Sequence, residues 1–254
     1  MIKLKSKEEI KILREGGKIL SAVLKRVEKM VKPGITTGEL DLMAEGLILE
    51  AGGEPSFKNY GDIHNPYPAT LCTSVNENLV HGIPNDYILK NGDIIGLDIG
   101  MRFPKQNGLY TDMAVTVAVG KVDKEHEHLI KVAKHALDIW IKNLKPGKNL
   151  NDIAKLVQKY IEDEGFGVIR DLVGHGVGHA VHEDPQIPNY YIPNFNVILK
   201  EGMVLAFEPM VSVGHYKVET LDDGWTVATK DKSFTSHFEH TVVITKRGCD
   251  VITR

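Results

Sequence analysis

The densest group of chemically competent residues lies in the segment GHGVGHAVHEDP, residues 174–185. It contains His175, His179 and His182, whose spacing would place them on one face of a helix. The intervening glycines, however, each weaken a helix by about 1 kcal/mol relative to alanine. We therefore predict a loop or a strand end, in which glycine allows the backbone to approach a bound ion or ligand closely.

Acidic residues interrupt two apolar strands of a predicted hairpin, which spans residues 93–101 and 110–119. Strand alternation places Asp98 and Asp112 on the faces that otherwise carry small residues. With the hairpin centred near Lys105, we expect the two aspartates to lie roughly opposite each other. Because bare carboxylates in such positions repel, we expect a cation between them.

An internal repeat relates the two halves of the chain. The sequence Lys-Pro-Gly, followed by an amphipathic helix, occurs at residues 32–34 and again at residues 145–147. Further on, residues 89–98 match residues 199–208. Generic similarity between helix–strand units could explain any one match, but several matches in the same order make chance improbable.

The repeat also pairs residues that can do chemistry. The pairs are Asp98 with Glu208, Asp112 with Glu239, and His81 with His182. Each half therefore contributes a histidine and two carboxylates at equivalent places. We predict a single domain, residues 1–254, made of similar halves at about residues 7–120 and 121–254.

The carboxylates and His175 together form an oxygen-rich ligand set. Such a set suits two divalent ions such as Mn, Fe, Co or Zn, and differs from a structural Cys/His zinc site. Two ions about 3.5 to 4 Å apart can activate a water and stabilise a tetrahedral intermediate, so the pattern predicts a hydrolytic centre. Strand-end caps or solvent-facing acids are the alternative, but they do not explain both aspartates together with Glu208 and Glu239. His81 and His182 would then contact the substrate carbonyl or transfer protons.

Hydrophobic periodicity predicts the elements that must position these residues. A capping box at residues 6–9 begins a helix that Lys-Pro-Gly at residues 32–34 ends, and a second helix runs from Thr37 to the glycines at 52 and 53. Further helices are expected at residues 123–144 and 150–164. Further strands are expected at residues 71–83, 204–213, 225–228 and 238–245.

Composition excludes several classes of protein. The chain has 254 residues, 42% of them hydrophobic, and a net charge of -3, as in ordinary globular proteins, so neither nucleic acid nor an anionic membrane is expected as the main partner. No stretch approaches 18 consecutive apolar residues, and no secretory signal is recognisable. Cys72 and Cys249 could form at most one disulfide, which fits a reducing compartment. We expect a cytoplasmic protein.

The order of the motifs resembles that of the type I methionine aminopeptidases. The motifs are HGIP (81–84), LDIG (97–100), YTDMAVT (110–116), GHGVGH…HEDP (174–185), FEPM (207–210), DDGWTVATKD (222–231) and FEHTVVIT (238–245). The resemblance covers nearly the whole chain. It implies the α+β pita-bread fold, in which two pseudo-symmetric halves with an inner curved, mainly antiparallel sheet and outer helices enclose a dinuclear metal site.

The resemblance also implies roles for individual residues. The implied metal ligands are Asp98, Asp112, His175, Glu208 and Glu239, with Asp112 and Glu239 bridging the ions. The implied catalytic residues are His81 and His182, which contact the substrate, and Glu208, which acts as general base. The implied lining of the methionine pocket is Tyr67, Cys72 and Trp225, with Phe57 and Tyr60 as further candidates.

The implied function is hydrolysis that removes the N-terminal methionine from nascent proteins and peptides. It would use two divalent ions (Co, Mn, Fe or Zn) in a cytoplasmic monomer that contacts the ribosome transiently. Some segments depart from the family pattern: residues 61–66 and 101–109 are longer than usual, and Val181 stands where an aromatic residue is frequent. These departures concern the shape of the pocket.

Two alternatives remain. Xaa-Pro aminopeptidases and proline dipeptidases share the fold and the ligand set, but they usually carry a further N-terminal domain, whereas the first helix here begins at about residue 7. A non-catalytic pita-bread protein that binds partners or RNA would belong to a different functional class. Such proteins lose ligands, and this chain keeps the whole set and is not basic.

Overall fold

A computed structural model of the protein describes residues 2–254. The helices are α1 (Lys7–Glu28), α2 (Thr37–Glu50), α3 (Lys124–Asn143) and α4 (Leu150–Asp163). The strands are β1 (Glu54–Pro55), β2 (Gly61–Asp62), β3 (Asn65–Pro66), β4 (Leu71–Val75), β5 (Asn78–Val80), β6 (Ile94–Phe103), β7 (Leu109–Ala118), β8 (Gly167–Val168), β9 (Gly174–Gly176), β10 (Glu183–Ile187), β11 (Val204–Phe207), β12 (Met210–Ser212), β13 (Val218–Thr220), β14 (Val227–Thr229), β15 (Thr235–His237), β16 (Glu239–Ile244) and β17 (Cys249–Val251). Within residues 2–254, no helix is both long and apolar enough to cross a membrane.

Local sequence signals fix the starts of α1 and α2. The Ser6 side chain accepts the Glu9 N–H at 3.1 Å, and the Glu9 carboxylate accepts the Ser6 N–H at 2.6 Å. Thr36 and Glu39 make the same reciprocal pair ahead of α2. Each capping box satisfies N–H groups that the first turn leaves unpaired, so both helices begin where the sequence predicts.

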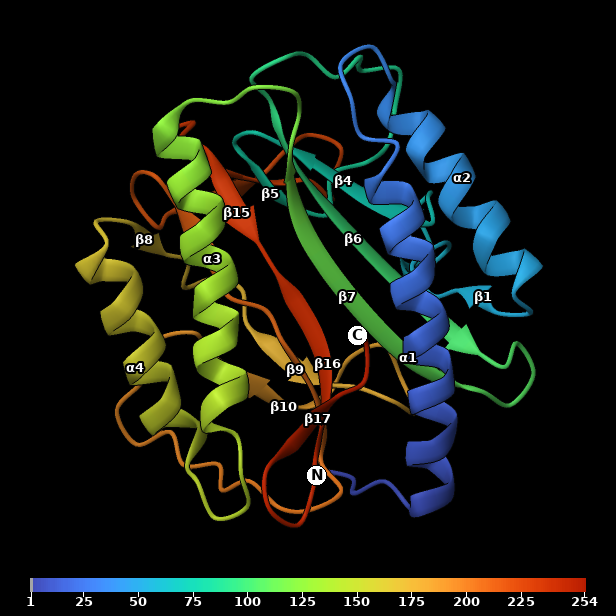
Figure 1. The fold of residues 1–254 in the computed structure, drawn as a ribbon, viewed down its shortest axis with the longest axis vertical. Coiled ribbons are helices and arrows are strands. Elements are labelled where there is room, and N and C mark those ends of the chain that lie inside the picture. Colours follow the sequence, from blue (N-terminus) through green and yellow to red (C-terminus); the bar gives the residue numbers. More distant parts are fainter. Residues whose placement is uncertain (1) are drawn as a thin grey trace.

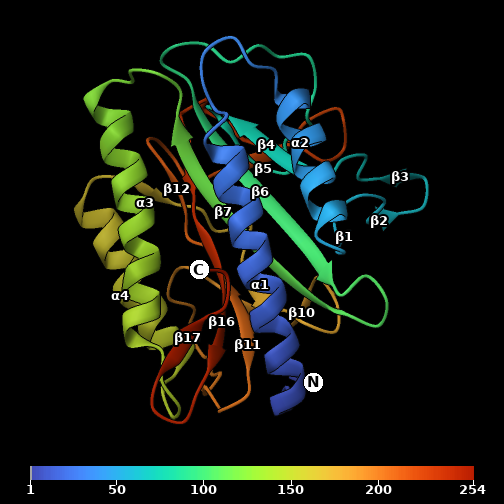
Figure 2. The same ribbon diagram turned by 45° about the vertical axis from the view of Figure 1, so that its right-hand side comes forward.

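A curved antiparallel sheet crosses the molecule in the strand order β1-β6-β7-β16-β11-β9-β10. Strand β4 also pairs with β6, and β17 also pairs with β16. Helices α1 and α2 lie over the strands of the N-terminal half, and α3 and α4 lie over those of the C-terminal half (Figures 1 and 2). The outer helices and inner sheet agree with the predicted α+β architecture.

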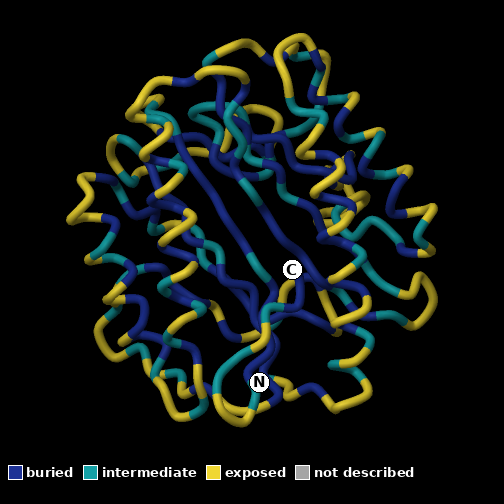
Figure 3. The backbone as a smooth tube through the Cα atoms, viewed as in Figure 1, coloured by how far each residue is buried: buried dark blue, intermediate teal, exposed yellow. Residues whose placement is uncertain are grey.

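Each helix pair covers an apolar core of its own. Under α1 and α2, Leu24 and Ile48 pack with strand residues such as Leu97. Under α3 and α4, Trp140 packs with residues such as Phe207. Burying each of these side chains contributes about 1.5 to 3 kcal/mol. The strands that cross the middle of the molecule are accordingly mostly buried (Figure 3).

Equivalent backbone contacts recur in the two halves. The N–H of Gly34 donates to the Leu89 carbonyl at 2.9 Å, and the N–H of Gly147 donates to the Leu199 carbonyl at 2.9 Å. Both glycines have positive φ, 94° and 84°, which the turn after Lys-Pro requires. These contacts support the internal repeat, and the division near residue 120 remains our prediction.

The register of the β6–β7 hairpin differs from the prediction. Asp98 pairs with Ala114, and Asp112 pairs with Gly100, so the aspartates lie diagonally rather than opposite each other. Both strands extend further than expected, as far as the Phe103–Leu109 pair, which moves the hairpin centre beyond Lys105. Gly100, the partner of Asp112, is two residues from Asp98 along β6. Side chains two residues apart on a strand point to the same face, so Asp98 and Asp112 still lie on one face of the sheet.

Candidate metal centre and adjoining pocket

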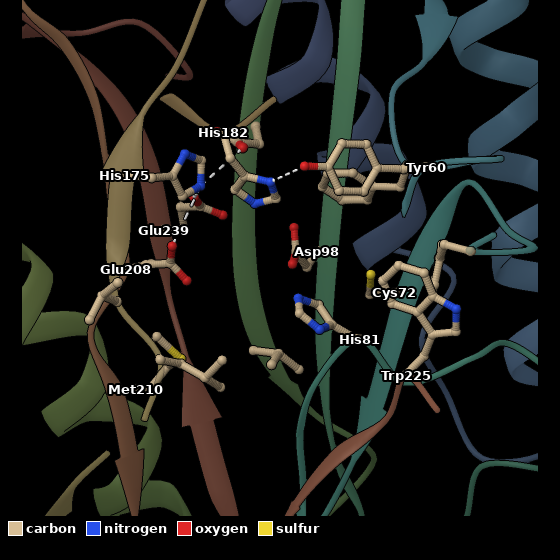
Figure 4. Close-up of a pocket in the computed structure, with 16 residues that line it drawn as sticks. Tyr60, Cys72, His81, Asp98, His175, His182, Glu208, Met210, Trp225 and Glu239 are labelled. Atoms are coloured by element: carbon tan, nitrogen blue, oxygen red, sulfur yellow. Dashed lines mark hydrogen bonds and ion pairs between the residues drawn. The ribbon is translucent and has the colours of Figure 1, made fainter. Parts of the chain in front are cut away.

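Neighbouring strands of the sheet contribute the predicted metal ligands in turn. In sheet order they are Asp98 on β6, Asp112 on β7, Glu239 on β16, Glu208 directly after β11, and His175 on β9. Residues far apart in the sequence thus converge where β7 of the N-terminal half pairs with β16 of the C-terminal half. Figure 4 shows most of these side chains directed toward one another.

Ala114 leaves space at the middle of this arrangement. It pairs with Asp98 on one side and with Glu239 on the other. Because a methyl group is the smallest side chain that a non-glycine residue can carry, the carboxylates on both neighbouring strands can face a common space above it. The small face of β7 noted in the sequence is therefore the floor of the candidate site.

Pro209 explains the position of Glu208. The sequence predicts one strand over residues 204–213, but the structure divides it into β11 and β12 at Glu208 and Pro209. Proline cannot donate a ladder hydrogen bond, so the strand is interrupted there. The break lets the Glu208 side chain reach toward His175, with its Oε1 3.6 Å from His175 Nε2.

His175 presents one ring nitrogen to the acidic groups. Its Nδ1 lies 2.9 Å from the Gly176 carbonyl oxygen, and its Nε2 lies 3.6 Å from Asp112 Oδ2 and 3.9 Å from Glu239 Oε1. When Nδ1–H donates to the carbonyl, Nε2 carries the free lone pair. The prediction of a loop or strand end in place of a helix is confirmed, because His175 lies on the short strand β9 and a loop follows it up to β10.

The electrostatics of the buried carboxylates fit a divalent cation. Burial raises the pKa of Asp98 to about 7 and that of Glu208 to about 8, and it also raises the pKa values of Asp112 and Glu239. Among the described residues, Oδ1 of Asp98 has no hydrogen-bond partner. Bare buried charges of this kind are unfavourable, and a cation between them would offset the cost. Asp112, His175 and Glu239 each offer an atom within 4.8 Å of the others, so this set fits a metal ion.

Two supporting residues were missed by the sequence analysis. Nε2 of buried His237 lies 3.4 Å from Glu208 Oε2. Thr241 accepts the Asp112 N–H at 3.1 Å and donates its hydroxyl to the Asp112 carbonyl at 2.8 Å. Alternation along the FEHTVVIT strand could have identified Thr241, because it shares a face with Glu239.

His81 and His182 enter the cavity from opposite halves of the chain. His81 follows β5 with φ of 57°, a conformation that non-glycine residues seldom adopt and that is enriched at functional sites. Burial lowers the pKa of His81 to about 4. The His182 residue keeps part of its surface exposed, but desolvation of its ring, with the neighbouring His175 and His81, lowers the pKa of His182 to about 3. Both imidazoles are therefore neutral at pH 7.

An apolar pocket adjoins the acidic cluster. The cavity holds about 190 Å³ and is lined by Phe57, Tyr60, Tyr67, Cys72, Val80, His81, Asp98, Asp112, Leu172, Val173, His175, His182, Glu208, Met210, Trp225 and Glu239. The rings of Tyr67 and Trp225 meet edge to face at 5.3 Å. The structure therefore brings together every site residue predicted from the sequence, and their individual roles stay predictions. Val80, Leu172, Val173 and Met210 also line the cavity and were not predicted, because single apolar residues carry no distinguishing pattern.

Comparisons with known proteins agree with this geometry. Residues 11–246 match metallopeptidase family M24. The chain is 47% identical over 254 residues to methionine aminopeptidase 1 of Bacillus subtilis (strain 168), with 100% of both chains covered. It is 39% identical over 254 residues to methionine aminopeptidase of Escherichia coli (strain K12), covering 99% of this chain and 94% of that one.

Solved structures extend the comparison to the fold. A crystal structure of methionine aminopeptidase from Thermotoga maritima is similar with a TM-score of 0.95 at 42% identity, and 100% of both chains is covered. Prolidase from Pyrococcus horikoshii OT3 is similar with a TM-score of 0.78 at 23% identity, covering 99% of this chain and 63% of that one, which shows a shared fold alone. Together with the curved antiparallel sheet, these neighbours confirm the predicted pita-bread fold.

Proposed function

The chain belongs to metallopeptidase family M24, and from this premise we propose that it is a methionine aminopeptidase that removes the N-terminal methionine from nascent proteins and peptides. The observation that carries the proposal is the apolar pocket beside the buried acidic cluster. A thioether side chain can pack against the rings of Tyr67 and Trp225, because sulfur makes favourable contacts with aromatic rings. The peptide bond that follows the first residue would then lie next to the candidate ligands.

The buried cluster of Asp112, His175 and Glu239 and the family together support divalent metal binding. As part of the proposal, two ions of Co, Mn, Fe or Zn are held by this cluster together with Asp98 and Glu208. When bound, they supply Lewis-acid activation of a water and of the substrate carbonyl.

The neighbouring side chains bind and orient the peptide and move protons. His182 and His81 donate hydrogen bonds to the carbonyl oxygen as negative charge develops on it, which a neutral imidazole can do through its N–H. Glu208 accepts the proton that the attacking water gives up and passes it to the amine that leaves when the peptide bond breaks. Asp98, with its unpaired Oδ1, receives the free α-amino group of the substrate.

The proposal also covers the cellular setting. It places the protein in the cytoplasm as a monomer that meets its substrates as N-terminal peptides of nascent chains, through transient contact with the ribosome. The absence of a strongly basic composition argues against a mainly RNA-binding role.

Peptide hydrolysis tests the substrate assignment directly. Purified protein supplemented with Mn, Co or Fe should release methionine from Met-Ala-Ser and leave Ala-Pro-Ala intact. Cleavage of Ala-Pro-Ala alone would instead assign the protein to the Xaa-Pro peptidases. Cleavage of neither peptide by metal-loaded protein would favour the non-catalytic alternative. A Glu239→Gln variant serves as the control for hydrolysis by a contaminating enzyme.

A further inference from the structure

Tyr60 makes a contact that the proposed mechanism does not use. Its hydroxyl oxygen lies 2.7 Å from Nδ1 of His182, and the two ring centroids are 5.3 Å apart. Figure 4 shows Tyr60 reaching across the cavity to His182, whose other ring nitrogen is directed into the cavity. The contact joins residues 122 positions apart in the chain, so the tertiary structure alone creates it.

We propose that Tyr60 is a positioning residue: its hydroxyl donates to Nδ1 of His182 and fixes the imidazole in the tautomer that carries its proton on Nε2, facing the cavity. The inference rests on the proposed function, because it assigns a use to the His182 N–H in donating to the substrate carbonyl. It extends that function by naming the group that determines which nitrogen holds the proton.

The positions of the protons favour donation from the Tyr60 hydroxyl to Nδ1 of His182. A neutral imidazole has one N–H and one lone pair, so the group that Nδ1 faces determines which nitrogen carries the proton. Burial raises the pKa of Tyr60, which therefore keeps a proton to donate. If the tyrosine proton points at Nδ1, the imidazole proton must be on Nε2. The reverse tautomer would present a lone pair to the developing negative charge and repel it.

The long segment at residues 61–66 holds Tyr60 in place. The Tyr60 N–H donates to the Phe57 carbonyl at 2.9 Å, and the Tyr67 N–H donates to the Tyr60 carbonyl at 2.8 Å. Between them, β2 and β3 form a short hairpin, and the Trp225 indole N–H donates to the Asn65 carbonyl at 3.0 Å. The extra length of residues 61–66, in which the sequence departs from the family pattern, therefore forms the hairpin that supports Tyr60.

Gly61 makes this support testable without altering Tyr60 itself. It has φ of 97°, and a Cβ at this position would lie 2.5 Å from the Trp225 ring. A Gly61→Ala change should therefore displace the hairpin, weaken the tyrosine–histidine contact and lower kcat; because the new Cβ meets Trp225 of the pocket, KM should rise as well. Unaltered kinetics in this variant would contradict the supporting role of the hairpin.

Kinetics of a Tyr60→Phe variant provide the first test. The change keeps the ring and removes the hydroxyl, so kcat for Met-Ala-Ser should fall about 10-fold or more, as for loss of a group that orients a catalytic histidine. KM and bound metal should stay within about twofold of wild type. A Tyr191→Phe variant, which removes an exposed hydroxyl elsewhere, should behave as wild type. Wild-type kcat in Tyr60→Phe, or a fall explained by lost metal, would overturn the proposal.

The tautomer itself can be observed without any peptide. Long-range ¹H–¹⁵N spectra of zinc-loaded protein with labelled histidine distinguish Nδ1–H from Nε2–H, and the His182 signals are those lost in His182→Gln. Wild type should show Nε2–H, and Tyr60→Phe should show a mixture. An Nδ1–H tautomer in wild type, or identical spectra in the two proteins, would refute the inference. Because no hydrolysis is measured, this result is separate from the outcome of the methionine assay.

Discussion

Asp98 and Glu208 illustrate how burial acts on single residues of this protein. Removal from water raises the pKa of each carboxyl group, to about 7 and about 8, far above the ordinary values of 3.8 and 4.5. The same burial lowers the pKa values of His81 and His182. The charged forms of the carboxyl groups are therefore unfavourable until a cation is bound, whereas the two histidines stay neutral whether or not a cation is present.

These shifts predict how the stability of the metal-free protein depends on pH. At pH 6.5 the folded protein still holds protons on Asp98 and Glu208 that the unfolded chain has already released, so raising the pH lowers the free energy of unfolding. The lowered pKa values of His81, His182 and His240 act in the opposite sense up to about pH 7.5, because at pH 6.5 about half of each imidazole is still protonated in the unfolded chain. We expect stability to fall by roughly 1 kcal/mol between pH 6.5 and 8.

Denaturant unfolding of chelator-treated protein at several pH values measures this effect. Saturating Mn²⁺ should abolish the fall, because the carboxylates are ionised when they bind metal. Constant stability of the metal-free protein across this pH range would show that the carboxyl groups are already ionised at pH 6.5.

A second prediction separates a ligand from a substrate-contacting residue. His182→Ala should lower kcat by about 100-fold, the loss typical of an oxyanion donor, while leaving metal content unchanged. Glu239→Gln should instead lower metal content, because it replaces a buried carboxylate in the cluster. Metal analysis by mass spectrometry beside peptide kinetics distinguishes them. An unchanged rate in His182→Ala would remove its assigned role.

Among the elements, the loop at residues 177–182 depends on the N-terminal segment. The buried ammonium of Lys5 lies 2.7 Å from Glu183 Oε2, and Glu183 Oε1 accepts the backbone N–H groups of His179 and Ala180 at 2.5 and 3.2 Å. Nε2 of His179 also lies 2.5 Å from Oε1 of Glu9 in α1. Groups outside the cavity thus hold the loop that carries His182.

Loss of the Lys5 charge should therefore lower both the free energy of unfolding and the rate of peptide hydrolysis. Lys5→Met removes the ammonium partner of the partly buried Glu183 carboxylate, which should cost about 1 to 3 kcal/mol in denaturant unfolding. It should also lower kcat, because His182 directly precedes Glu183. The matched control is Arg14→Met, which removes the solvent-exposed ion pair with Asp250 and should change stability by less than about 0.5 kcal/mol. Equal effects of the two changes would contradict the role given to Lys5.

For the whole molecule, the contact between α1 and the C-terminal segment joins the halves. Leu13 of α1 lies in one buried cluster with Val204, Val243 and Ile252 from the other end of the chain. At Gly17 the helix approaches so closely that a Cβ would lie 2.4 Å from the Ile252 side chain and 2.6 Å from its carbonyl oxygen. The absence of a side chain at Gly17 permits this packing.

Paired glycine substitutions test the contact. Gly17→Ala should destabilise the protein by about 1 to 3 kcal/mol, because the added methyl group meets backbone that must shift. Gly46→Ala, inside α2 with no atom within 4 Å of the new Cβ, should stabilise it by about 0.5 to 1 kcal/mol through higher helix propensity. Thermal unfolding gives both values. Stabilisation by both changes would show that α1 can move away from the C-terminus without cost.

The sequence by itself determined the four helices and the main strands, and it predicted the candidate site residues. Capping boxes at Ser6 and Thr36 set helix starts through bonds spanning three residues, and alternation around Asp98 and Asp112 set the faces of their strands. These signals are local, so they can be read without the fold. The order of the motifs then identified the family, because the motifs contain the residues that the family uses to bind metal and substrate.

The tertiary structure alone decided how these residues meet. Three of these contacts join segments that lie far apart in the sequence or whose register no local pattern predicts. They are the diagonal placement of Asp98 and Asp112, the approach of His237 to Glu208, and the Tyr60–His182 contact. Each depends on strand register or on the packing of one half against the other. These are set by the balance of many buried contacts, and so they follow only from the whole folded chain.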